Sequence, residues 1–372
     1  MQIAVTTGLE ISNLNVSVHY GSAWWVTDHC ESLKACGVNV SSRLVENLLR
    51  LGKSEMVLAR YADVRSSRVR NGPGIFQIEN PLTRYQEMTP NKVILTDPIY
   101  FPYFPNAAEW RWAPERFVRL SGGTERDIDL LVVGSHRRAG NVSQQSREIA
   151  EAAINDFGGA PEVLKWPESV RCFLSLVARG EIDPREPTCP SIREDIVELQ
   201  ARLNLLRRLR REAIVSEICR VAKGNRVMVV GNLGEVVREI EKVRKVSNLK
   251  VVRPKNWSRI CALGRRSKFL LVTNPALPNT LNERFRVALR TGSIPLVEPY
   301  AVYDDYAEAC EQFPRFDYGG QPLADTFKKC LASESQLRES LGNFATRLRE
   351  SEVDSYEAWA VETISRALRH QG

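Results

Sequence analysis

The sequence predicts an α/β protein with two domains, each built around a β-sheet. The chain has 372 residues, which is more than one compact core usually holds. Short apolar segments alternate with polar stretches that carry Gly and Pro, which is typical of strands that alternate with helices. We therefore expect a first domain over 1–122, a second over 123–345, and a final helix over 346–372 that packs back toward the first domain.

The first domain opens with a predicted strand–helix–strand unit. Residues 1–7 read as a strand, and a loop that contains Gly21 and Ser22 leads into a helix over 24–36 that Gly37 ends. The strand that starts at Val38 completes the unit. Further strands are predicted at 56–59, 75–78 and 92–96, a surface loop rich in Pro and aromatic residues at 98–114, and a linker at 121–124.

The second domain repeats the alternation. A strand at 127–133 runs into a glycine-bounded loop over 134–140 and a helix over 143–157. No element is assigned to the proline-rich residues 160–190. A long helix is predicted at 192–222, strands at 226–230, 250–252 and 268–273, a helix at 235–246, and helices from about residue 323 onward.

Charge and composition narrow the class of protein. The net charge of +7 suits an anionic ligand such as a nucleotide diphosphate, a nucleic acid or an anionic membrane surface. No apolar run approaches the roughly 20 residues of a membrane-spanning helix, and the first residues lack the basic region of a secretory signal. The eight cysteines show no Cys-x-x-Cys spacing, so we expect free thiols, no metal site and a cytoplasmic location.

The segment 268–297 carries the clearest chemical signal. A buried strand is followed by a loop and then by a helix with one apolar stripe at Leu281, Phe285, Ala288 and Leu289. Gly292 ends this helix, and the next strand follows at 294–297. A loop that enters a helix N-terminus presents free N–H groups, so it can hold an anion.

Two side chains in the first turn of this helix are candidate ligand contacts, each with a plainer alternative. Glu283 can accept hydrogen bonds from ribose or sugar hydroxyls, and Arg284 can pair with a diphosphate. Alternatively, Thr280 and Glu283 form a capping box, and Arg284 lies on a solvated helix face. The spacing of Asp127 and Asp129 resembles a metal-binding pair, but both lie in an apolar strand, so we interpret them as structural.

The same segment resembles the donor-binding motif of α1,3-fucosyltransferases and that of exostosin and spore-maturation-type glycosyltransferases. The resemblance rests on Ser267-Lys-Phe, Asn274, Asn282-Glu-Arg284, Ala288-Leu and Gly292-Ser-Ile-Pro-Leu-Val297. Two glutamates of these families are replaced, by Thr273 and by Val287, and a lysine is replaced by Arg284. The resemblance therefore indicates the superfamily, while the donor sugar stays open.

The resemblance implies the GT-B architecture, in which two Rossmann-like domains face a cleft and the C-terminal domain binds a nucleotide sugar. Asn274, Glu283 and Arg284 would contact the donor. Gly134, with Arg137 and Arg138 after it, is similar to the loop that approaches the diphosphate in these families. The function implied is transfer of a sugar from a UDP or GDP sugar to an acceptor hydroxyl, with no further cofactor and no metal.

On the acceptor side, Gly21 and Ser22 are similar to the glycine loop of GT-B acceptor domains. Transfer needs a group that takes the proton of the acceptor hydroxyl, and His19, just before this loop, is the candidate base, with Glu10 and Asp28 as rivals.

The sequence leaves two candidate acceptors, a surface glycan and a modified DNA base. A run of arginines over 202–211 is interpreted as a solvated helix face whose arginines pair with acidic residues. The alternative interpretation is a patch that binds the phosphate backbone of a nucleic acid. In the DNA case, the aromatic residues of 98–114 would stack a flipped base. The competing class is a non-catalytic GT-B-like protein that binds nucleic acid or a protein partner.

Overall fold

The computed structural model of the chain divides into two compact units. The first comprises Met1–Arg116, Trp166–Ile196 and Arg349–Gly372, and the second comprises Phe117–Lys165 and Val197–Leu348. The structure describes residues 15–19, 31–35, 39–42, 55–60, 74–78, 92–104, 106–109, 111, 125–134, 141–155, 167–183, 190–231, 247–253, 257–273, 283–298 and 313–369. The predicted strand at 1–7, the linker at 121–124 and the helix at 235–246 lie outside these ranges.

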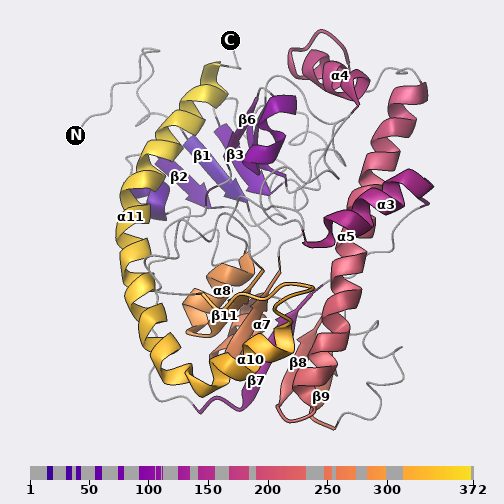
Figure 1. Cartoon of the computed structure of the whole chain (residues 1–372). Helices are drawn as coiled ribbons and strands as arrows, with labels where there is room; N and C mark the ends of the chain where they lie inside the picture. Colours follow the sequence, from indigo (N-terminus) through magenta and orange to yellow (C-terminus); the bar gives the residue numbers. More distant parts are fainter. Residues whose placement is uncertain are drawn as a thin grey trace. The chain divides into compact units, whose positions relative to one another are not determined.

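The first unit contains a six-stranded parallel sheet in the order β2-β1-β3-β4-β5-β6 (Figure 1). Its strands are β1 (Asn15–His19), β2 (Asn39–Ser42), β3 (Glu55–Arg60), β4 (Gly74–Gln77), β5 (Lys92–Thr96) and β6 (Ala107–Glu109). The described residues of β4 and β5 are buried throughout, as expected for strands of a parallel sheet that is covered on both faces.

The second unit contains a five-stranded parallel sheet in the order β11-β10-β7-β8-β9. Its strands are β7 (Ile128–Val133), β8 (Val227–Val230), β9 (Leu249–Val252), β10 (Ser267–Val272) and β11 (Ile294–Val297). Parallel pairing needs a crossover between consecutive strands, and described helices lie between β7 and β8, between β9 and β10, and between β10 and β11. The predicted α/β class with parallel strands is thereby confirmed.

Four described α-helices lie wholly within the second unit. They are α3 (Gln144–Ala152), which the short η6 (Ala153–Asn155) continues, α7 (Trp257–Arg265), α8 (Glu283–Thr291) and α10 (Leu323–Ala332). Helix α8 packs on β10 and β11, and Phe285 of its apolar stripe contacts Phe313 and Phe344 edge to face, with ring centroids 5.2 Å and 6.1 Å apart. Gly292 ends α8 with φ of +66°, a conformation that glycine adopts without strain.

Helices α5 (Pro190–Ala222) and α11 (Glu334–Arg369) each contribute residues to both units. The long helix predicted at 192–222 and the helical C-terminal region are confirmed. No helix in the described part of the chain combines the length and the apolar character needed to cross a membrane.

Five elements were missed or misread from the sequence. Strand β1 lies in the stretch after residue 7 that was expected to be a loop. Residues 98–114, expected to be a loop, contain the 3-10 helix η5 (Pro98–Tyr103) and strand β6, because Tyr100 and Phe104 are buried core residues rather than a surface cover. Helix α4 (Glu168–Ala178) lies in the stretch left without assignment, and its N-cap is Pro167, so the prolines flank the helix instead of breaking it. Helix α7 was not predicted.

Arg126 joins three elements at the amino-terminal end of the second sheet. Its guanidinium donates to the carbonyl oxygens of Ser267, of Gly264 at 3.3 Å and of Thr291 at 3.1 Å, which belong to the start of β10 and the last turns of α7 and α8. Burial, with the neighbouring positive charge of Arg338 as a second cause, lowers the pKa of Arg126 to about 10. The side chain stays charged near neutral pH and neutralises helix C-termini.

We expect Arg126→Met to destabilise the second unit by about 2–4 kcal/mol, because three backbone acceptors lose a charged donor. The exposed Arg265→Met on α7 is the matched control and is expected to change stability by less than about 0.5 kcal/mol. Urea unfolding followed by circular dichroism measures both. Equal transition midpoints for the two variants would contradict the role assigned to Arg126.

Candidate ligand-binding site

The second sheet changes direction between β7 and β10. From β7 the chain continues to β8 and β9 on one side, whereas β10 and β11 lie on the other side of β7. The connections that leave β7 and β10 therefore diverge above their carboxyl ends. In open parallel α/β sheets, ligands bind in the crevice at such a point, so the residues that follow β7 and β10 define the candidate site.

Two glycines keep the carboxyl ends of β7 and β8 free of side chains. Gly134 follows β7, and its N–H donates to the carbonyl of Val230 at 3.0 Å. Gly231 follows β8 with φ of +111°, and a Cβ at this position would lie 2.2 Å from the carbonyl oxygen of Gly134. A larger residue at 231 would displace the backbone at Gly134, so the glycine allows the ends of β7 and β8 to approach closely.

Arg284 ties the first turn of α8 to the end of β10. Its Nη1 donates to the carbonyl oxygen of Thr273 at 2.8 Å, and the side chain is half-buried. The alternative interpretation of Arg284 as part of a solvated helix face is therefore wrong. The bond holds the guanidinium at the carboxyl edge of the sheet, on the side where α8 begins.

Glu283 is the first residue of α8 and is also half-buried. Its proposed capping partner, Thr280, lies outside the described residues, so the capping box stays a prediction. The position of Glu283 at the helix N-terminus places a carboxylate and the positive end of the helix dipole at the same edge as Arg284.

Glu298 is a site residue that the sequence reasoning missed. It follows β11 directly, its side chain is fully buried, and its N–H bonds the carbonyl of Val272 at 3.4 Å, so it lies beside the end of β10. The hydroxyl of Tyr318 donates to its Oε1. The available signal was an acidic residue immediately after an apolar strand at the predicted ligand edge.

The segment before Tyr318 is positioned by β11. Val297 accepts from the N–H of Phe316 at 3.1 Å and donates to the carbonyl of Pro314 at 2.9 Å. This extends the parallel pairing beyond β11 for a short distance. The Tyr318–Glu298 contact therefore rests on backbone hydrogen bonds, which orient the carboxylate.

The first sheet has a point of divergence of its own, between β1 and β3. Strand β1 pairs with β2 on one side and with β3 on the other, and the chain continues from β3 to β4, β5 and β6. His19 is the last residue of β1, in register with Ala59 of β3. The backbone of the candidate base thus lies at the carboxyl end of a strand that borders this point.

The remaining predicted site residues are not placed. Gly21, Ser22, Arg137, Arg138 and Asn274 lie outside the described residues, as do the rival bases Glu10 and Asp28. Val287, which stands where the glycosyltransferase motif that this segment resembles has a glutamate, is fully buried in α8. That position therefore presents an apolar side chain to the core.

Asp127 and Asp129 are structural, as predicted. They lie at the amino-terminal end of β7, opposite the candidate site, where Asp129 binds Lys268 at 2.9 Å and Asp127 pairs with Arg266. Burial raises the pKa of Asp129, but the hydrogen bonds from Lys268 and from the N–H of Arg226 outweigh it and hold the pKa below its usual value. Among the described residues, no group of acidic, His or Cys side chains has the arrangement of a metal site.

Part of the arginine run of α5 is buried in the protein. Arg210 and Arg211 are buried, and Arg210 donates to the carbonyls of Ala153 and Ile154, each at 3.1 Å. Arg202 donates to Ser146, and Arg208 pairs with Glu212 as expected. The solvated face paired with acids therefore holds for Arg208, whereas Arg210 binds protein carbonyls and the buried Arg211 is closed to a phosphate backbone.

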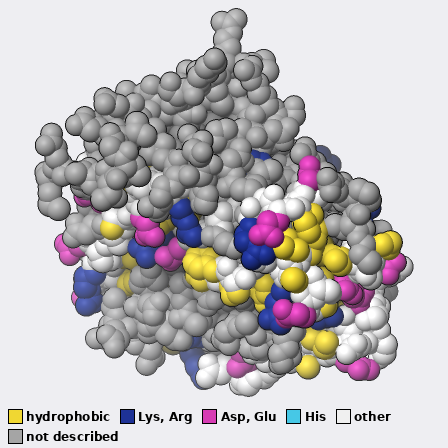
Figure 2. All heavy atoms as spheres, turned by 90° about the horizontal axis from the view of Figure 1, so that it is seen from above, with side chains coloured by type: hydrophobic (Ala, Val, Ile, Leu, Met, Phe, Trp, Pro, Cys, Tyr) yellow, Lys and Arg dark blue, Asp and Glu magenta, His cyan; other side chains and the backbone are white. Residues whose placement is uncertain are grey.

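Charges of both signs are interspersed on the described part of the face in Figure 2. Lys and Arg side chains lie beside Asp and Glu there, with apolar side chains between them. The four described cysteines are free thiols, as predicted; Cys219, Cys261 and Cys330 are buried and Cys172 is exposed. Burial raises the pKa of the Cys330 thiol to about 11, so this thiol is unreactive at neutral pH.

The fold and the candidate site belong to an α/β protein with two parallel sheets. No family model matches the sequence, and no match to a curated protein was found. Among solved structures, that of AviGT4, a glycosyltransferase involved in avilamycin A biosynthesis, is similar over 96% of this chain and 98% of that chain, with 12% sequence identity and a TM-score of 0.47. A similarity of this size carries no conclusion about activity.

We expect Gly231→Ala to destabilise the second unit by about 1–3 kcal/mol, because the positive φ and the contact with Gly134 both oppose a methyl group. A methyl group at Gly224 would have no neighbouring atom within 4 Å, so Gly224→Ala is the control and should be neutral or slightly stabilising. Thermal unfolding of both variants measures the difference. A Gly231→Ala protein as stable as wild type would refute the close approach.

Proposed function

We propose that the chain is a glycosyltransferase that moves a sugar from a nucleotide diphosphate sugar, with UDP or GDP as the nucleotide, to an acceptor hydroxyl. The observation that carries the proposal is the carboxyl end of the second sheet, where Gly134 and Gly231 present bare backbone after β7 and β8 and Arg284 is bonded to Thr273 after the neighbouring β10. A diphosphate needs close backbone approach and a fixed cation, and this edge offers both.

In this proposal the second unit holds the donor. Arg284 pairs with the diphosphate, and Arg137 and Arg138, which follow Gly134 in the chain, approach it from the β7 side. Glu283 and Asn274 accept and donate hydrogen bonds with ribose or sugar hydroxyls. The cationic side chains neutralise the charge that develops on the leaving nucleotide diphosphate, so the scheme includes no metal and no further cofactor.

The first unit, in the same proposal, holds the acceptor near Gly21 and Ser22. His19 accepts the proton of the acceptor hydroxyl, and the hydroxyl oxygen forms a bond to the anomeric carbon of the sugar. The bond from that carbon to the nucleotide diphosphate breaks at the same time. The two units then face a shared cleft, as in GT-B enzymes. The sugar and the acceptor, whether a glycan or a modified DNA base, are left open.

The donor site is tested by ligand-induced thermal stabilisation with UDP, GDP and their common sugars. A ligand at about a hundred times its Kd stabilises the native protein by about 2.7 kcal/mol, which raises the melting temperature by about 5–10 °C for a unit of this size. We expect Arg284→Ala to weaken nucleotide binding roughly 10- to 100-fold through loss of charged hydrogen bonds. Glu283→Ala should abolish transfer while the protein stays folded.

The control for charge is Arg265→Ala, an exposed arginine before the amino-terminal end of β10. It removes the same charge from the same unit, and nucleotide stabilisation should persist. If no nucleotide or nucleotide sugar shifts the wild-type melting temperature, the proposal fails. Transfer at wild-type rate in both Glu283→Ala and Arg284→Ala would also reject it.

The assignment of His19 as the catalytic base is tested by a separate measurement. His19→Gln is expected to lower kcat by about 10²- to 10⁴-fold, the usual contribution of a general base. Because the donor site lies in the other unit, nucleotide stabilisation of this variant should equal that of wild type. Steady-state kinetics with the donor found in the thermal-stabilisation screen measures the effect. An unchanged kcat would show that His19 is not the base and would leave Glu10 or Asp28 as the candidate.

A non-catalytic binding protein is the second candidate. The observation that favours it is Val287, buried where the similar glycosyltransferases carry a glutamate. Such a protein would bind nucleic acid or a protein partner, and buried Arg210 and Arg211 would take no part in it. The thermal-shift panel separates the two candidates, because only a transferase requires stabilisation by a nucleotide sugar.

A further inference from the structure

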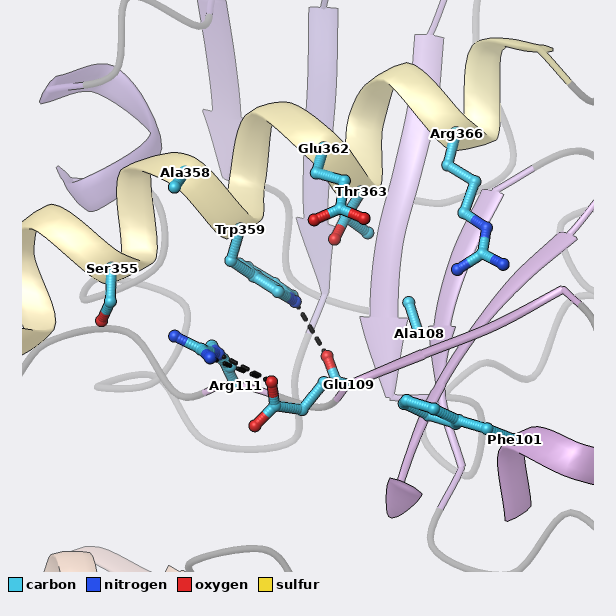
Figure 3. Close-up of a pocket in the computed structure, with 10 residues that line it drawn as sticks. All are labelled: Phe101, Ala108, Glu109, Arg111, Ser355, Ala358, Trp359, Glu362, Thr363 and Arg366. Atoms are coloured by element: carbon cyan, nitrogen blue, oxygen red, sulfur yellow. Dashed lines mark hydrogen bonds and ion pairs between the residues drawn. The ribbon is translucent and has the colours of Figure 1, made fainter. Parts of the chain in front are cut away.

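The first unit contains a cavity that the proposed reaction does not use. It has a volume of about 370 Å³, which falls within the range of small-ligand sites. Its walls are η5, the end of β6 and one face of α11 over 355–366. Figure 3 shows side chains from these elements converging on one space.

The cavity lies at the far edge of the first sheet from His19. Strand β6 is the edge strand, and β5, β4 and β3 lie between it and β1. At the usual interstrand spacing, four steps separate the strands by about 19 Å. A ligand in the cavity therefore occupies a place distinct from the candidate base.

The positive and negative charges of the side chains that line the cavity are equal in number. Two carboxylates, Glu109 and Glu362, and two guanidiniums, Arg111 and Arg366, line the cavity. Arg111 donates to Glu109 at 3.0 Å, so part of the charge is already neutralised within the wall. An anion such as phosphate would meet no net positive charge here, and a simple cation would meet no net negative charge.

The polar groups nevertheless suit hydroxyls. A carboxylate only accepts hydrogen bonds and a guanidinium only donates them, whereas a hydroxyl does both. Glu362 makes no hydrogen bond or ion pair with any residue that the structure describes, and its side chain is exposed. This carboxylate is therefore available to accept from ligand hydroxyls, with the hydroxyls of Ser355 and Thr363 on the same wall.

Aromatic side chains complete the wall. The indole N–H of Trp359 donates to the backbone carbonyl of Glu109 at 2.8 Å, which fixes the ring across the gap between α11 and β6 (Figure 3). Phe101 of η5 lines the opposite side. Arg366 donates to the carbonyl of Ala107 at 2.8 Å, so α11 is tied to the strand at two points and the cavity is pre-formed.

From these features we propose that this cavity binds a neutral saccharide, with its hydroxyls on Glu362 and the arginines and its C–H face on the aromatic wall. A sugar ring combines vicinal hydroxyls with an apolar face and carries no charge, which matches a charge-balanced cavity with aromatic sides. The aromatic segment 98–114 thus contributes Phe101 to a sugar site rather than a stack for a flipped base. The inference stands whether or not the second unit binds a nucleotide sugar.

Saturation-transfer NMR tests the site with the whole chain and a panel of methyl glycosides of glucose, galactose, mannose and N-acetylglucosamine. At least one glycoside is expected to give a signal. Glu362→Gln should weaken its binding roughly tenfold by removing a charge-assisted hydrogen bond. Ala358→Trp, at an exposed lining position, should fill the cavity and remove the signal.

The control is Glu357→Gln, an exposed glutamate of α11 that does not line the cavity, and it should leave the signal at its wild-type level. UDP and GDP are added to separate the site from the donor site, and they should not displace the glycoside. Displacement by either nucleotide, displacement by inorganic phosphate, a signal that survives Ala358→Trp, or silence across the panel would each overturn the inference.

Discussion

Strands β7 and β10 are neighbours in the second sheet although α3, α5, β8, β9 and α7 lie between them in the chain. Their parallel register, from Ser267 opposite Ile128 to Leu271 opposite Val132, brings Gly134 and Thr273 to the same edge. In open parallel α/β sheets, ligands bind where the connections diverge in this way. The candidate donor site depends on this pairing.

The two ends of that pairing have different chemistry. At the amino-terminal end, Arg126, Lys268 and Arg266 each bond a carbonyl or carboxylate, and the polar groups are used up in holding the fold. At the carboxyl end, Gly134 and Gly231 carry no side chain, Arg284 is bonded to Thr273 after β10, and the buried Glu298 follows β11. We therefore propose that residues at one end of this sheet stabilise the fold and residues at the other end bind the ligand.

Local signals were sufficient for most strands and for α8. Continuous apolar runs such as 130–133 and 269–272 are completely buried, and periodicity located the stripe at Phe285, Ala288 and Leu289. The errors in the predicted elements came where tertiary contacts determine the secondary structure. Tyr100 and Phe104 belong to the core, so a proline-rich segment folds into a 3-10 helix and an edge strand that no local pattern announces.

The candidate site likewise combines residues that local sequence patterns predict with residues that only tertiary contacts reveal. Arg284 was found from its place in a helix first turn, but its bond to Thr273 joins residues eleven apart and depends on the loop path. Glu298 and the cavity beside Trp359 depend on contacts between distant segments, and the indole bond to Glu109 spans 250 residues. Periodicity and spacing carry no information at that range.

The central claim is that a nucleotide diphosphate binds at the carboxyl edge of β7 and β10. Hydrogen exchange of the whole chain, read by mass spectrometry with and without saturating UDP and GDP, tests it most directly. Binding at this edge predicts slower exchange in peptides that cover Gly134, Thr273 and the first turn of α8, with unchanged exchange around 264–268. Unchanged exchange at all three places, or slowing confined to the first sheet, would contradict the claim.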